Sequence, residues 1–425
     1  MAKSLRLDRF GNAHAPGLPY ARGAILASTA DDIAKLRTAW SVIQARYQRS
    51  GAASVYNFSG LERCLRCKDD DLPHMDDEIA PALYGDGLKS HALEHLGGQS
   101  PIHDIALLNR TTAGIVAAML SLARPGDTVV GVAPSYSHPC VGRAAARAGA
   151  RFVDAADLDT LRTVLDQEAN VPLVILTRLA VSYEVLDLQI CRDAVALART
   201  KGALVMLDDA GGARVGPAVF DQPRSLELGV DVAVTGLDKY GVTGPRLGLL
   251  GGLTDLVADI RATAWELGLE ARPMLYPAAL QSLEAYRPEK VREMVAATRA
   301  FASDLSPKLD GQLFETPVSV QIRGEDILDM ALARSGQNDT SLVPYEATAA
   351  LAMLLLRNSG ILTVHFAGVP PGTSALMFKF ISPETLSRFG GPTALAHAVE
   401  AALSELATII GEPEAVRRLL FEEAD

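Results

Sequence analysis

An aspartate and a lysine, 31 positions apart (239 − 208), are the residues whose types and surroundings predict chemistry in this chain. Asp208 follows the apolar run Ala203 to Leu207, and Lys239 lies in a segment with several glycines. A carboxylate at the end of a buried strand needs a cationic partner, because an unpaired buried charge is costly. Glycines let the backbone around a lysine pass close to a ligand. The pair therefore predicts a ligand site that combines a nucleophilic amine with a buried carboxylate.

This combination predicts pyridoxal 5'-phosphate (PLP) as the cofactor. Lys239 would form the internal aldimine, and Asp208 would keep the ring nitrogen protonated. Ala210 is small enough to let the ring lie flat against the sheet, and Asp209 is expected to hydrogen-bond around the site without binding the cofactor. Taken alone, Asp208 could cap a turn and Lys239 could be a surface lysine. Their order and spacing favour the cofactor.

A phosphate site is predicted where the segment Asn109 to Gly114 enters a helix that begins near Thr112. Free amides at a helix N-terminus and the hydroxyls of Thr111 and Thr112 suit a phosphate group, and Arg110 lies beside them. The threonines could instead be simple helix caps.

Two further segments are expected to reach the same site. Thr235 or Gly236, just before the lysine, would be the second contributor to the phosphate site. His138 follows the expected strand 128–132 and could stack on the exposed face of the ring, with Tyr136 as the alternative. A lone histidine is also often an ordinary loop residue.

The composition describes a globular protein with a full core. The chain has 425 residues, 48% hydrophobic and 21% charged, which is long enough for a large and a smaller domain. Four cysteines predict no disulfide framework and fit a reducing cytoplasm. The N-terminus has no apolar signal region, and no apolar run is long enough to span a membrane.

The net charge of −11 argues against a broad nucleic-acid surface. The first 50 residues differ, with eight basic side chains against three acidic ones. This segment is either a helix face packed on an acidic body or a site for an anionic partner.

From about residue 100 to 255, short apolar segments alternate with turns and helical segments, which predicts a mostly parallel sheet covered by helices on both faces. Catalytic residues should then lie at the carboxyl ends of the strands. We predict an N-terminal helical segment (1–55), a large cofactor-binding domain (56–280) and a small α+β domain (281–425), with a helical connector at 278–304. The expected strands are Ile105–Leu108, Thr128–Val132, Arg151–Val153, Leu173–Leu176, Leu204–Leu207, Val232–Val234 and Leu247–Leu250.

Cys64 and Cys67 have the spacing of half a zinc site, but zinc needs four ligands. No second such pair accompanies them, although His74, His91 and His95 could be recruited. We therefore predict no metal. The glycines form neither a dinucleotide fingerprint nor a Walker loop.

The chain resembles the selenocysteine-synthase-like branch of fold type I PLP-dependent enzymes, within the aspartate aminotransferase superfamily. The resemblance implies a large domain with a seven-stranded type of sheet, and a homodimer or larger assembly with active sites at the subunit interface. It also assigns Lys239, Asp208, Thr111 and Thr112 the roles given above. The matching strings are Tyr56 to Gly60, Leu96 to Gly98, Asn109 to Gly114, Ser137 to Pro139, Asp208 to Ala210, Asp238-Lys239 and Gly244 to Arg246.

Two departures from the aminotransferase pattern affect the expected substrate. Residues 176–182 lack the Asn-Pro-x-Gly turn that such enzymes usually carry. The C-terminal stretch offers Lys379 where an arginine commonly clamps the substrate carboxylate. The substrate could therefore lack a free α-carboxylate, or Arg178, Arg246 or Arg323 could bind it instead.

These observations predict a cytoplasmic PLP-dependent lyase or transferase that acts on a small amino acid or amine. The favoured reaction is β-elimination or β-replacement, in which Lys239 removes the Cα proton from an external aldimine and a quinonoid follows. An aminotransferase or an aldolase-like carbon–carbon bond former would use the same residues. A non-catalytic PLP-fold protein with a binding or regulatory role is the alternative from another class. We expect neither a nucleic-acid nor a membrane partner.

Overall fold

The protein is represented by a computed structural model, which describes residues 6–309 and 311–422. Contacts within the chain divide the described residues into two compact units. Unit 1 comprises the residues up to Leu61 together with those from Glu293 onward, and unit 2 comprises Glu62–Arg292. The described residues of the expected N-terminal helical segment thus belong to the same unit as the C-terminal residues.

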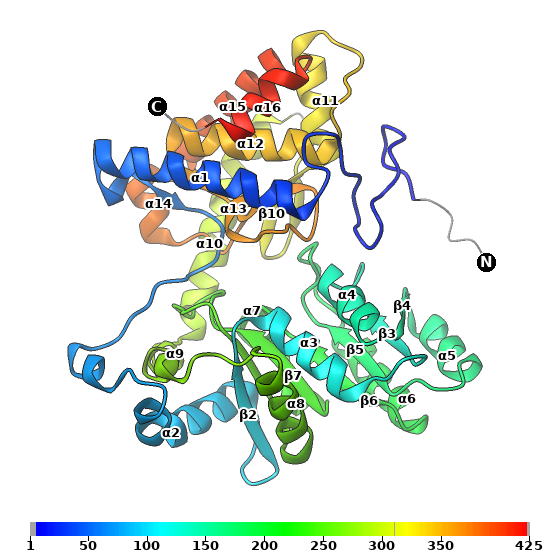
Figure 1. Ribbon diagram of the computed structural model, residues 1–425. Helices are drawn as coiled ribbons and strands as arrows, with labels where there is room; N and C mark the ends of the chain where they lie inside the picture. Colours follow the sequence, from blue (N-terminus) through cyan, green and yellow to red (C-terminus); the bar gives the residue numbers. More distant parts are fainter. Residues whose placement is uncertain (1–5, 310, 423–425) are drawn as a thin grey trace. The chain divides into compact units, whose positions relative to one another are not determined.

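Unit 2 is built on a seven-stranded sheet in the order β2-β8-β7-β6-β5-β3-β4 (Figure 1). The run from β7 to β4 is parallel, whereas β8 pairs antiparallel with both β7 and β2. The prediction of a mostly parallel sheet is confirmed. The strands are β2 (His103–Leu108), β3 (Thr128–Val132), β4 (Arg151–Ala155), β5 (Leu173–Thr177), β6 (Leu204–Asp208), β7 (Val232–Gly236) and β8 (Gly248–Leu253).

Helices cover both faces of this sheet. Alternate side chains of a strand point to opposite faces, so each strand contributes to the packing on both. Val130 and Val174 belong to the cluster shared with α2, α5, α6 and α9, whereas Val129 and Ile175 belong to the cluster shared with α3, α4 and α8. The helices of unit 2 are α2 (Ile79–Leu96), α3 (Thr111–Leu122), α4 (Pro139–Arg147), α5 (Leu158–Gln167), α6 (Leu188–Thr200), α7 (Gly212–Phe220), α8 (Thr254–Glu266) and α9 (Tyr276–Glu284).

The strand order reverses direction between β3 and β5. From β3 the chain passes outward to β4, and it then returns to β5 and continues through β6 to β7 on the other side. In open α/β sheets, ligands bind beyond the carboxyl ends of the strands at such a switch point. The segments that follow β3, β5, β6 and β7 are therefore the ones that should form a site.

Unit 1 combines helices with a three-stranded antiparallel sheet in the order β12-β10-β9 and a short parallel pair, β1 and β11. Helix α10 (Pro288–Leu305) begins in unit 2 and continues in unit 1. The other elements are α1 (Thr29–Ser50), β1 (Tyr56–Asn57), β9 (Phe314–Thr316), β10 (Ser319–Arg323), α11 (Gly324–Ser335), α12 (Pro344–Ser359), β11 (Ile361–Leu362), α13 (Val364–Ala367), β12 (Ala375–Lys379), α14 (Pro383–Phe389), α15 (Gly391–Ile409) and α16 (Pro413–Phe421). Short 3-10 turns occur at Ala52–Ser54, Asp69–His74, Leu226–Leu228, Pro273–Leu275 and Ser306–Lys308.

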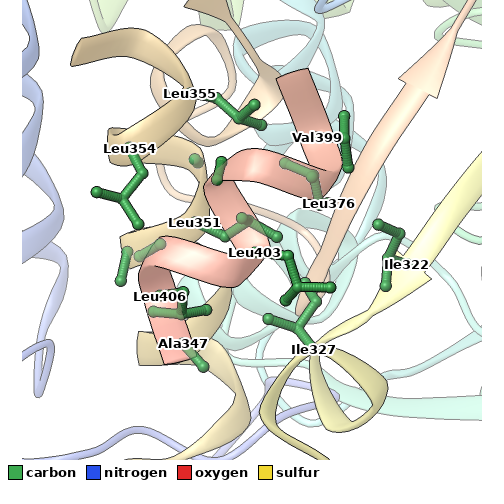
Figure 2. Packing of buried hydrophobic residues seen from close by; sticks show 14 of the residues in the cluster. Ile322, Ile327, Ala347, Leu351, Leu354, Leu355, Leu376, Val399, Leu403 and Leu406 are labelled. Atoms are coloured by element: carbon green, nitrogen blue, oxygen red, sulfur yellow. The ribbon is translucent and has the colours of Figure 1, made fainter. Parts of the chain in front are cut away.

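The apolar face of α15 packs into the core of unit 1. Val399, Leu403 and Leu406 recur at helical spacing and lie among Leu351 of α12 and Leu376 of β12 (Figure 2). All five side chains are buried. Burial of such side chains stabilises a fold by about 1.5–3 kcal/mol each.

Several basic residues near the N-terminus serve inside unit 1. Arg22 donates to Asp32 at 2.8 Å, Lys35 lies 3.5 Å from the same carboxylate, and Arg46 donates to the carbonyl of Arg357. Burial lowers the pKa of Lys35 to about 8. These side chains therefore form hydrogen bonds and ion pairs within unit 1 and do not form a free basic surface. Within the part of the chain that the structure describes, no helix is both long and apolar enough to cross a membrane.

Candidate functional site

The carboxyl ends of β6 and β7 bring the two principal predicted residues to one edge of the sheet. Asp208 is the last residue of β6, and Lys239 follows the last residue of β7 by three positions. The two strands are hydrogen-bonded neighbours, with Asp208 in register with Val234. An electrostatic interaction between the two charged groups lowers the pKa of Asp208 relative to burial alone.

Asp208 is a buried carboxylate with an unused acceptor. It is 3% exposed, and its Oδ1 has no hydrogen-bond partner among the described residues. Burial, with a smaller contribution from Asp209, raises its pKa to about 7, while an N–H of Ala210 and the charge of Lys239 act in the opposite direction. A carboxylate in this state would be stabilised by a cationic hydrogen-bond donor.

Lys239 reaches the same edge with its amine held by the preceding residue. Its Nζ donates to Asp238 Oδ1 at 2.7 Å, and its side chain is 21% exposed. A Cβ on Gly236 would lie 2.5 Å from this Nζ and 2.9 Å from Thr111 Oγ1. A side chain at position 236 would therefore displace the Lys239 amine and the Thr111 hydroxyl from these positions.

The predicted phosphate site is a helix N-terminus with an unused hydroxyl. Arg110 is the extended N-cap of α3 and Thr111 is its first residue, followed by Thr112. Thr111 Oγ1 is buried and has no partner in the described part of the chain. A Cβ on Gly248 of β8 would lie 2.6 Å from the backbone carbonyl carbon of Arg110, so this glycine is required for α3 to begin here.

Asp238 is the centre of a cationic cluster that the sequence did not reveal. Besides Lys239, it binds Arg63 Nε at 3.1 Å, and Arg246 Nε lies 3.9 Å away. Burial opposes ionisation, but Lys239 and Arg63 lower the pKa of Asp238 to about 2. Burial, followed by the charges of Arg63 and Arg110, lowers the pKa of Arg246 to about 10. Arg246, which the sequence suggested as a substrate residue, thus lies beside Asp238, whereas no motif pointed to Arg63.

Arg178 is buried, and its guanidinium is held by hydrogen bonds within the protein. It is 1% exposed, and its Nε and Nη2 donate to Asp209 at 3.1 and 2.5 Å, while Nη1 donates to the carbonyl of Pro223. Asp209 also accepts a hydrogen bond from Ser225. All three guanidinium nitrogens are engaged, so we do not carry Arg178 forward as a substrate residue.

Arg214 of α7 is a second residue that sequence reasoning missed. Its buried guanidinium donates to the carbonyls of Ala210 and Gly236 and to the hydroxyl of Thr235, and it contacts His95. It therefore ties the ends of β6 and β7 together. Thr235 also donates to the carbonyl of Ala210, so the hydroxyl predicted to bind phosphate is engaged within the protein.

His138 lies at the N-cap of α4 beyond β3. Its Nδ1 accepts the N–H of Cys140 at 3.1 Å. Burial, then the charges of Arg143, Lys239 and Arg110, lowers the pKa of His138 to about 4. The ring is therefore neutral at neutral pH.

Four other groups that the sequence analysis named have the following surroundings. Lys379 is buried in β12 of unit 1, and Arg323, also in unit 1, stacks on Phe314. Cys64 is an exposed free thiol and Cys67 a partly buried one. The described residues contain no group of three or more histidine, cysteine, aspartate or glutamate side chains placed to hold a metal.

Comparison with solved structures identifies the fold. Alanine–glyoxylate aminotransferase from Nostoc sp. superimposes with a TM-score of 0.56 at 15% identity, over 82% of this chain and 95% of that one. The chain has the α/β fold of fold type I PLP-dependent aminotransferases.

Comparison with sequences gives more similar relatives. A UPF0425 pyridoxal phosphate-dependent protein of Methanothermobacter thermautotrophicus is 29% identical over 402 residues, or 93% of this chain and 100% of that protein. A protein of the same description from Methanosphaera stadtmanae is 28% identical over 361 residues, or 84% of this chain and 90% of that protein. No protein-family model matches the chain.

Proposed function

We propose that this chain is a PLP-dependent enzyme that acts on a small amino compound in the cytoplasm. The observation that carries the proposal is that Oδ1 of the buried Asp208 has no hydrogen-bond partner among the described residues, at the end of the strand beside the one that leads to Lys239. The relatives named pyridoxal phosphate-dependent proteins support it.

The donor set fits this cofactor. The protonated ring nitrogen of PLP would supply the cationic donor that Asp208 lacks, and the phosphate would take the amides at the start of α3 and the unused hydroxyl of Thr111. Arg110 adds positive charge there. The neutral imidazole of His138 suits stacking on an aromatic ring. Lys239, which is partly exposed, would hold the cofactor covalently.

When bound, PLP supplies an electron sink for negative charge at the substrate Cα. The protein's own residues would do the rest. Lys239 Nζ would take the proton from Cα and deliver it to the departing group on Cβ. Asp238 Oδ1 would hold this amine in position, and the Arg214 hydrogen bonds would fix the two strand ends relative to each other.

Loss or replacement of a β-substituent is the reaction we propose, which makes the enzyme a lyase or a transferase. The selenocysteine-synthase-like strings support it, as does the absence of the Asn-Pro-x-Gly turn after β5. Transamination would use the same residues and would be distinguished by its products. A homodimer or larger assembly is proposed from the same resemblance, and light scattering of the purified protein would test it.

The test is an absorbance spectrum of the purified protein with PLP, compared with that of Lys239→Ala. A visible band that the variant lacks would support both cofactor and lysine. Amino acids that shift the band would identify substrates, ammonia release would indicate elimination, and transfer of nitrogen to a keto acid would indicate transamination. A wild-type protein that binds no PLP would refute the proposal.

A further inference from the structure

Two arginines from distant parts of unit 2, Arg63 and Arg246, pair with one carboxylate, and a third, Arg110, adds its charge to this cluster. Arg63, Arg110 and Arg246 each interact electrostatically with Asp238, and the charges of Arg63 and Arg110 both act on Arg246. Asp238 forms ion pairs with Arg63, Lys239 and Arg246. Neighbouring like charges repel one another. Holding them together therefore costs stability unless an anion binds between them.

The guanidinium groups are accessible to a ligand. The side chains of Arg63 and Arg246 are 27% and 35% exposed. Arg63 uses Nε for Asp238, so the two terminal nitrogens of its fork remain for another acceptor. A planar fork of this kind matches a carboxylate in two-point geometry.

The cofactor's phosphate does not neutralise the whole cluster. Lys239, Arg63 and Arg246 lie at ion-pair distance from Asp238, and the charge of Arg110 acts on the same carboxylate. A phosphate monoester carries about −1.5 to −2 charges at neutral pH. Asp238 and the phosphate would therefore offset at most three of the four positive charges, one of which belongs to Lys239 itself.

We propose that Arg63, together with Arg246, binds a carboxylate of the substrate, so that the substrate is an amino acid and not a simple amine. This rests on the proposed function. Asp238 binds Lys239 through Oδ1 and Arg63 through Oδ2, so the amine and the guanidinium contact the two oxygens of the same carboxylate. The amino and carboxylate groups of an α-amino acid share one carbon and can engage both. Arg63 would take the role that a C-terminal-domain arginine commonly fills, a position where this chain has the buried Lys379.

The test compares two reagents that capture PLP from the loaded protein and differ in one carboxylate: aminooxyacetate and methoxyamine. For each protein, the rate constant for aminooxyacetate is divided by that for methoxyamine, and the result is divided by the same ratio for free PLP. The final value measures how strongly the protein prefers a reagent with a carboxylate, and it requires no knowledge of the natural substrate. Wild-type protein should prefer aminooxyacetate by about 10-fold or more, the size expected for a charge-assisted hydrogen bond. Arg63→Gln should lose most of this preference while its Kd for PLP changes less than about 3-fold, since a bond lost only to the carboxylate leaves the cofactor's own contacts intact.

Arg66→Gln is the matched control, because it removes the same charge from an exposed position in the same segment. It should behave as wild type. An equal ratio in wild type and Arg63→Gln would overturn the inference. So would a loss of PLP affinity in Arg63→Gln as large as its loss of preference, because Arg63 would then serve the phosphate. A wild-type protein that binds no PLP would instead refute the proposed function.

Discussion

At the scale of single residues, Asp208 combines deep burial with an acceptor atom that no described residue satisfies. Its folded-state pKa of about 7 means that the cofactor-free protein keeps a proton that the unfolded chain releases near pH 3.9. A group whose pKa is raised by folding contributes to the free energy of unfolding at low pH, and this contribution is lost as the pH rises through the folded-state pKa.

We therefore expect the free energy of unfolding of the cofactor-free wild-type protein to fall between about pH 4 and pH 7, when it is compared with that of the Asp208→Asn variant at the same pH. The difference should reach a few kcal/mol, at about 1.4 kcal/mol for each pKa unit. Urea unfolding of both proteins across this range measures it, and histidine titrations cancel because both proteins contain them. Parallel pH profiles would contradict the assignment.

The Arg178–Asp209 pair gives a second prediction at this scale. Asp209→Ala would leave a buried guanidinium without its counter-ion, so it should destabilise unit 2 by about 3–5 kcal/mol. Glu227→Ala, which breaks the exposed Arg224–Glu227 pair, is the control and should cost less than about 1 kcal/mol. Urea unfolding compares them. A similar small cost for both would show that Arg178 does not depend on Asp209.

At the scale of elements, the start of α3 depends on close packing against β8. Gly248→Ala would place a Cβ 2.6 Å from the backbone of Arg110, so the first turn of α3 must shift. We expect a loss of about 1–3 kcal/mol in stability and weaker PLP binding.

Gly85→Ala in α2 is the matched control, because nothing lies within 4 Å of the added Cβ. It should stabilise the protein by up to about 1 kcal/mol. Urea unfolding and PLP titration of both variants check the prediction. It would be refuted if Gly248→Ala bound PLP with wild-type affinity.

At the scale of the whole molecule, unit 1 is discontinuous in sequence, and its N-terminal part is held by buried polar contacts. Glu346 of α12 accepts the N–H groups of Ile25 at 2.6 Å and Leu26 at 3.0 Å, and it is fully enclosed. Loss of this carboxylate would leave buried donors unsatisfied.

We expect Glu346→Ala to destabilise unit 1 by about 3 kcal/mol and to open the segment around residue 25 to proteolysis, because each unsatisfied buried donor costs about 1–3 kcal/mol. Limited proteolysis with mass spectrometry and urea unfolding are the measurements. Glu414→Ala, at an exposed ion pair on α16, should leave both unchanged. Equal cleavage of the two variants would show that Glu346 does not hold the N-terminal segment.

The sequence by itself determined the sheet and the placement of Asp208 and Lys239. Apolar runs of strand length, separated by helical segments, specify a parallel sheet, and the residues after such strands necessarily meet at one edge. The N-terminus of α3 followed from the same local pattern. The predicted strand Ile105–Leu108 was found, but its antiparallel pairing with β8 was not foreseen, since pairing direction depends on contacts distant in sequence.

Only the tertiary structure decided which arginines face the site. The sequence suggested Arg178 and not Arg63 as a substrate residue, yet Arg178 is enclosed by Asp209, whereas Arg63 meets Asp238 across 175 positions. Arg214 likewise reaches two strand ends through side-chain hydrogen bonds that no periodicity encodes. A charged side chain is assigned by the partners that folding brings to it, because burial and ion pairing depend on the path of the whole chain and not on local spacing.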